Sequence, residues 1–144
     1  MSERTVKEVV EGQEVITASA TTSVHDAARL MREHNIGALV VVEAEKLVGI
    51  FTERDGLFRV LADGLDVKTT QLSTVMTANP QTIPATSAFT TALQMMQEGR
   101  FRHIPVVEDG RVIGIVSVRD ALGPELEAFV YEMLRQEQIQ QVLA

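Results

Sequence analysis

Apolar residues along this chain fall either at helical spacing or in short continuous runs. Between residues 24 and 34 they recur on one helical face, which predicts a helix there. Ser23 and Asp26 have capping-box spacing at its start, and Asn35 with Gly37 favours its end, because both tolerate left-handed backbone. Residues 38–42 and 47–51 are continuous apolar runs, typical of paired strands covered on both faces.

The same order of elements returns in the second half of the chain. Residues 17–55 can be laid over residues 82–120 without a gap, and many of the paired residues are identical. Each half is predicted to contain, in order, a strand, a helix, two strands and a helix. A short helix over residues 5–10 is predicted to precede the first half. Because repeats usually bury their apolar faces against each other, we expect an α/β (α+β) fold built from two packed copies.

The predicted organisation is a first repeat over residues 1–64, a connector over 65–71, a second repeat over 72–123 and a C-terminal helix over 124–144. Gly123 and Pro124 are expected to interrupt the helical pattern, with Pro124 in the first turn of the last helix. An isolated helix of that length is marginal in water, so its apolar face must pack on this module or on a second copy. That face carries Leu126, Phe129, Val130, Met133 and Leu134, and the methionines on helical stripes, Met95, Met96 and Met133, are predicted to pack in the core.

A strand end that turns into a helix is the most distinctive repeated feature. The residues from Gly49 to Asp55 correspond to those from Gly114 to Asp120: glycine, two apolar residues, a small hydroxyl, a free position, arginine and aspartate. The hydroxyls are good helix N-caps, and a duplicated capped turn without a ligand would explain them. Alternatively, the N–H groups, hydroxyl and guanidinium form an anion site, beside which the carboxylate can bind a sugar diol. A phosphate site beside a ribose site would together bind a nucleotide.

This motif, with the run from Phe101 to Val107 before its second copy, resembles the cystathionine-β-synthase (CBS) domain. Over roughly residues 5–123, the two copies resemble the tandem pair called a Bateman module. The resemblance implies two repeats packed sheet to sheet, with two clefts of which one or both hold an adenosine-containing ligand such as AMP, ADP, ATP or NAD(H). Carried over by position, the ribose would bind Asp55 and Asp120, and the phosphates would bind Thr52 with Arg54 and Ser117 with Arg119.

The resemblance also implies that backbone groups recognise adenine. These lie near Thr17, Ala18, Ala38 and Leu39 in one cleft, and near Thr82, Ile83, His103, Ile104 and Pro105 in the other. Pro84 and Pro105 follow the family's pattern, whereas the first copy departs from it with Ser19 and Val40. Arg102 either adds a second phosphate clamp or is a solvated loop arginine.

Composition narrows the classes of function. The chain has 144 residues, 45% hydrophobic and 23% charged, which fits a compact globular protein. The absence of cysteine excludes disulfides and thiolate chemistry, and no histidine cluster has metal-ligand spacing. A net charge of −7 opposes binding to nucleic acid. With no signal-peptide pattern and no apolar run long enough to span a membrane, we expect a soluble cytoplasmic protein.

Three hypotheses follow. The leading one is a non-catalytic regulatory module, expected to form a homodimer, that binds an adenine nucleotide as regulatory ligand, requires no cofactor, and signals to an unknown effector protein in trans. The second is an interaction module with vestigial clefts that acts through its C-terminal helix, and in which a charge at Phe129 or Met133 would abolish binding. The third is a nucleotide hydrolase that uses Asp120 as its base.

Overall fold

The computed structural model describes residues 4–143, with side chains described at 4–121 and 131–141. The first half contains, in order, α1 (Val6–Val9), β1 (Thr17–Ser19), α2 (Val24–His34), β2 (Ala38–Glu43), β3 (Lys46–Thr52), α3 (Glu53–Asp55) and the π-helix η1 (Gly56–Leu61). The second half contains α4 (Leu72–Val75), β4 (Thr77–Ala78), β5 (Ile83–Pro84), α5 (Phe89–Gly99), β6 (His103–Glu108), β7 (Arg111–Ser117), the 3-10 helix η2 (Val118–Ala121) and α6 (Leu122–Leu143). The repeated β-α-β-β-α order is confirmed.

Local chemistry explains the ends of the helices. The Ser23 hydroxyl accepts a hydrogen bond from the N–H of Asp26 at 3.1 Å, which caps α2 as predicted. Asn35 closes the same helix in the left-handed conformation, with φ of 53°. Arg100 takes that conformation at the end of α5, with φ of 58°, so the two long helices of the body end in the same way.

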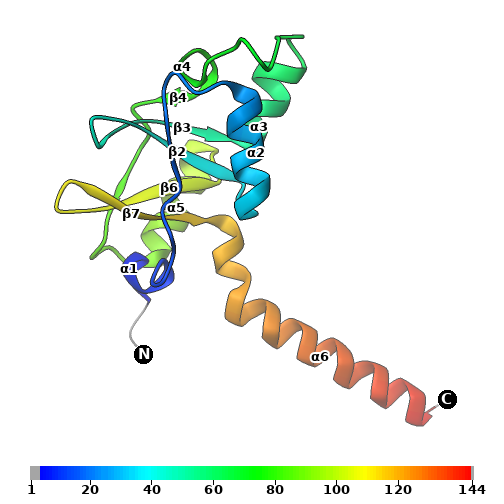
Figure 1. Ribbon diagram of the computed structural model, residues 1–144. Helices are drawn as coiled ribbons and strands as arrows, with labels where there is room; N and C mark the ends of the chain where they lie inside the picture. Colours follow the sequence, from blue (N-terminus) through cyan, green and yellow to red (C-terminus); the bar gives the residue numbers. More distant parts are fainter. Residues whose placement is uncertain (1–3, 144) are drawn as a thin grey trace.

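The strands form one sheet in each half (Figure 1). The first has the order β1-β2-β3-β4 and the second β5-β6-β7. In both, the strand before the long helix pairs in parallel with the strand after it, and the next two strands form an antiparallel hairpin. This pairing brings the start of β2 opposite Thr52 and the start of β6 opposite Ser117, so both strand-to-helix turns lie beside the beginning of a central strand.

Each sheet is buried on both faces. On one face of the first sheet, Leu39 and Val41 pack in a core with Ala27 and Met31 of α2. The intervening Val40 is fully buried but belongs to neither helix-facing core. Because side chains alternate along a strand, Val40 points to the opposite face. Pro105 has the same position in β6, and β3 contacts β7, so these faces pack against each other. The prediction of sheet-to-sheet packing is confirmed.

The segments that precede each half pack on the other half. Val6 and Val10, at the start of the chain, are buried in the core of the second half, and Leu72 and Val75 of α4 are buried in the core of the first. Two isolated bridges, Thr5 with Ala88 and Ser23 with Gln71, hold these segments at the start of the opposite long helix. The two halves therefore complete each other's cores.

Four local features differ from the sequence predictions. Strand β4 follows the connector yet pairs with β3, so it extends the first sheet. The helix after Thr52 changes to π-helix geometry at Gly56. Helix α6 begins at Leu122, and Gly123 and Pro124 do not interrupt it, because proline is tolerated in a first helical turn. Met133, predicted in the core, is 47% exposed on α6, which projects from the body (Figure 1).

Candidate functional site

In both strand-to-helix turns, the backbone N–H and the hydroxyl of Thr52 or Ser117 donate to Oδ2 of the aspartate three residues later. In the first, the N–H of Thr52 donates to Oδ2 of Asp55 at 2.9 Å, and the N–H of Asp55 donates to the Thr52 hydroxyl at 3.2 Å. In the second, the N–H of Ser117 donates to Oδ2 of Asp120 at 2.7 Å, and its hydroxyl lies 3.4 Å from the same oxygen. Each aspartate is therefore fixed at a helix start, as the capping pattern predicts.

The first turn is closed by its own helix. Asp55 is only 8% exposed, and its Oδ1 lies 3.6 Å from Nε of Arg59. Arg54 does not reach Asp55, because its guanidinium stacks on the ring of Phe58, 5.1 Å from the centroid. The side chains predicted to bind phosphate and ribose in the first repeat thus already have partners within α3 and η1.

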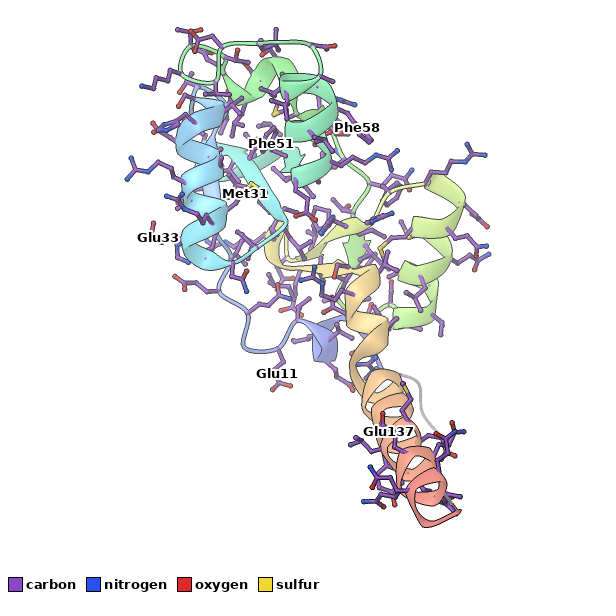
Figure 2. The ribbon with its side chains drawn as sticks, turned by 90° about the vertical axis from the view of Figure 1, so that its right-hand side faces the viewer. Glu11, Met31, Glu33, Phe51, Phe58 and Glu137 are labelled. Atoms are coloured by element: carbon purple, nitrogen blue, oxygen red, sulfur yellow. The ribbon has the colours of Figure 1, made fainter. Side chains whose placement is uncertain are left out.

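The second turn opens onto a cleft of about 1170 Å³ between the two halves. One part of its wall comes from α2 and η1 of the first half and is mostly apolar, although Arg32 of α2 also lines it. Figure 2 shows Met31 and Phe51 between these elements, whereas Phe58 lies on the outer side of η1. The other part is polar and comes from the loop before β6 and from the end of β7 with η2: Arg102, His103, Ser117, Arg119 and Asp120.

The cleft brings together only some of the predicted site residues. Six of them line it: Ala38, Arg102, His103, Ser117, Arg119 and Asp120. The remainder lie outside its lining. The side chains of Leu39, Ile83, Ile104 and Pro105 are buried in the body, so only their backbone could meet a ligand. Thr17 is exposed on β1, and Thr82 is exposed directly before β5. Ala18 is half-buried beside Thr17, and Thr52, Arg54 and Asp55 form the closed first turn.

The electrostatic character of the polar wall is mixed. Arg102 and Arg119 supply positive charge, and Asp120 supplies a carboxylate beside them. Burial lowers the pKa of His103 below its ordinary value, while the carboxylate of Glu53 acts in the opposite direction. At neutral pH His103 is therefore an uncharged imidazole that can donate or accept a hydrogen bond. This wall can bind an anion through the two arginines and hydroxyl groups through Asp120.

Most residues that line the cleft were missed from the sequence, among them the polar residues Gln13, Arg32 and Glu53. Glu53 belongs to the first turn but lines the cleft of the second, and its only sequence signal is that the equivalent position of the second repeat is Val118. Gln13 also lines it and exchanges two hydrogen bonds of 3.0 Å with the backbone of Ile115, which covers the edge of β7. No local sequence pattern predicts the contact of Gln13 with the backbone of Ile115.

Two kinds of feature are absent from the described residues. They contain no group of three or more histidine, aspartate or glutamate side chains that could hold a metal ion. No described helix combines the length and apolarity needed to cross a membrane.

Known protein families and relatives show to which family this chain belongs. The model of the CBS domain matches the chain twice, at residues 6–61 and 72–124. The mitochondrial CBS domain-containing protein CBSX3 of Arabidopsis thaliana is 41% identical over 105 residues, which cover 69% of this chain and 51% of that protein. The chain spans from 22% to 51% of the length of the Arabidopsis relatives that it matches.

Solved structures agree with the fold. The crystal structure of the CBS domain protein NE2398 superimposes with a TM-score of 0.80 at 35% identity and covers 87% of this chain and 99% of that one. The CBS domain protein PAE2072 from Pyrobaculum aerophilum, solved in complex with AMP, has a TM-score of 0.74 over 81% of this chain and 89% of that one. At its 22% identity the likeness shows the fold alone. The chain belongs to the CBS domain family and contains a tandem pair of CBS domains.

Proposed function

We propose that this chain is a non-catalytic regulatory module that binds an adenosine-containing nucleotide in the cleft between its two halves. The observation that carries the proposal is the polar wall of that cleft, where Ser117, Arg119 and Asp120 meet Arg102 and His103. Asp120 would bind the ribose hydroxyls, and the arginines would bind the phosphate. The AMP found in PAE2072 supports this class of ligand for the same fold. The first turn, closed by Arg59, would serve mainly to support the structure.

The size and position of the cleft support this reading. Its volume of about 1170 Å³ exceeds the roughly 300–1,000 Å³ usual for small-molecule pockets, so the cleft has room for a nucleotide. Its walls come from both halves, so a bound nucleotide would contact both and favour one relative arrangement. That preference can be no larger than the difference in the ligand's affinity for the two arrangements. An effector protein in trans would sense the arrangement.

Calorimetric and thermal-shift titration with AMP, ADP, ATP, NADH and S-adenosylmethionine tests this proposal. A ligand at a hundredfold excess over Kd stabilises the folded state by roughly 2.7 kcal/mol. We expect binding by at least one adenine nucleotide, loss of that binding in Asp120→Ala, and its retention in Asp55→Ala. The two variants form a matched pair, since they alter the same position of the two repeats.

Two outcomes would contradict the proposal. Absence of binding at millimolar concentrations of every nucleotide would favour the interaction-module function. Release of a product from any nucleotide, with protein and nucleotide in equal amounts, would contradict the non-catalytic assignment and support the hydrolase hypothesis.

A homodimer forms part of the proposal, with a second copy of the chain as the partner of helix α6. In the described part of the chain, large exposed apolar side chains concentrate on η1 with the following connector and on α6, where Tyr131, Met133, Leu134 and Ile139 are 47–69% exposed. Exchange of α6 between two copies would bury both and close a two-fold dimer.

A further inference from the structure

His103 lies where the charged groups of the cleft meet. It is the first residue of β6 and pairs with Ser117 of β7, so their side chains lie on the same face of the sheet. Four charged groups in the cleft act on its ring: Arg102 from the preceding loop, Arg119 and Asp120 from η2, and Glu53 from α3. A phosphate held by the two arginines would therefore lie close enough to act on this ring as well.

The imidazole of His103 is accessible to a ligand. It takes part in no hydrogen bond or ion pair among the side chains that the structure describes. In the described part of the chain, every fully buried side-chain nitrogen or oxygen has a hydrogen-bond partner, so the ring nitrogens of His103 are not sealed in the core. The equivalent position of the first repeat is Ala38. Only the second repeat therefore places a titratable ring at this point of the cleft.

The charge of His103 depends on the charges around it. Burial is the main reason why its pKa lies below the ordinary value of 6.5. The two carboxylates that act on the ring raise its pKa, whereas the two arginines lower it further. Arg32 and Glu14 line the same cleft, from α2 and from the segment before β1, but are not among these causes. A bound phosphate would offset the charge of the arginines and add negative charge near the ring. Both effects favour the protonated imidazole.

We propose that binding of the nucleotide is coupled to protonation of His103, so that the module binds its ligand more tightly as the pH falls from about 8 to about 6. The inference rests on the proposed function, because it concerns the regulation of the same site. Such coupling is reciprocal: the ligand strengthens proton binding by the same factor by which the proton strengthens ligand binding. The module would then respond to acidification as well as to its nucleotide.

The first test follows the protonation of each histidine by NMR of its imidazole C–H groups as the pH is varied. The full chain is titrated with and without a saturating amount of the adenine nucleotide that binds most tightly in the calorimetric titration. His25 and His34 are internal controls, because neither lines the cleft. We expect the nucleotide to move the titration midpoint of His103 to higher pH and to leave the other two unchanged. Replacement of each histidine by glutamine assigns the signals.

The second test compares the affinity of the same nucleotide for the wild type and for His103→Gln at pH 8 and pH 6, measured by calorimetry. A terminal phosphate itself takes up a proton near a pKa of about 6, so the ratio of the two affinities is used to remove the ligand's own titration. We expect the ratio of wild-type to variant affinity to rise by at least about fivefold at the lower pH. His34→Gln is the matched control, since His34 is exposed at the end of α2, and its ratio should stay constant.

Several results would overturn the inference while leaving the nucleotide sensor intact. They are a midpoint of His103 that stays in place or moves to lower pH, a shift of His25 instead, which would place the phosphate against α2, and an affinity ratio that is constant for His103→Gln or rises equally for His34→Gln. Failure of the wild type to bind any adenine nucleotide at either pH would overturn both proposals, so the two failures can be distinguished.

Discussion

Nε of Arg59 lies 3.6 Å from Oδ1 of Asp55, whereas the equivalent position after Asp120 is held by Pro124. In the part of the chain whose side chains are described, no cation forms an ion pair with Asp120. Two aspartates with the same place in the repeat therefore have different surroundings. The first is buried and paired within its own helix, and the second lines the cleft. The residue four positions after the aspartate thus differs between the repeats: it is an ion-pair partner in the first and a proline in the second.

Asp55→Ala is expected to lower the free energy of unfolding by about 1–2 kcal/mol, since it removes the carboxylate of the capping box and the ion-pair partner of Arg59. Asp120→Ala should cost less than half as much, because its carboxylate is less buried. Urea denaturation of both variants measures the difference. Equal losses would show that the second turn depends on its aspartate as strongly as the first.

His103 is expected to make stability depend on pH. Its pKa in the folded state is lowered by burial from an ordinary value of 6.5, so the unfolded chain binds a proton more readily. The stability from the neutral imidazole is fully present above pH 6.5 and is lost as the pH falls toward the folded-state pKa. His103→Gln should therefore lose less stability than the wild type between pH 7 and pH 5, measured as melting temperature. Parallel profiles of the two proteins would contradict this prediction.

Gly49 and Gly114 are equivalent glycines that should respond differently to alanine. A Cβ at Gly114 would lie 2.5 Å from Cβ of Val10, which is fixed to the backbone, and overpacking of this kind costs about 1–3 kcal/mol. A Cβ at Gly49 would meet the thioether of Met76, which can move aside. Chemical denaturation should therefore show a larger loss for Gly114→Ala. A larger loss of stability for Gly49→Ala would contradict this prediction and would show that Met76 cannot move aside.

The helices and strands of each half could be predicted from local sequence patterns, because each of these elements depends on residues that are neighbours in the chain. The spacing of Ser23 from Asp26 sets the start of α2, and the apolar run from Ala38 identifies a strand buried on both faces. The internal repeat then predicted the second half from the first. Both the fold and the family were therefore available from the sequence.

Contacts between the halves could not be predicted in this way. Nothing in the neighbourhood of Val6 or Leu72 indicates that each completes the core of the opposite half. For the same reason the arrangement of the cleft, which is lined by Glu53 of one half and Arg102 of the other, appears only in three dimensions. The roles given to the predicted site residues stay predictions, and the binding experiments above test them.

Self-association should depend on two different surfaces, because the proposed exchange of α6 places α6 of one copy on η1 of the other. Leu57 of η1 is 51% exposed and Leu134 of α6 is 56% exposed. If α6 of each copy packs on η1 of the other, Leu57→Glu and Leu134→Glu should each be largely monomeric in size-exclusion chromatography with light scattering. Their nucleotide affinity should change little, since neither residue lines the cleft.

A mixture of the two variants distinguishes exchange from other dimers. One contact in the mixed dimer joins the intact α6 of Leu57→Glu to the intact η1 of Leu134→Glu, while the other contact carries both substitutions. The mixture should therefore recover part of the dimer that neither variant forms alone. In a dimer made by like surfaces, η1 on η1 or α6 on α6, every mixed contact would contain one glutamate, and mixing would recover little. A mixture that stays monomeric would exclude the exchange of α6.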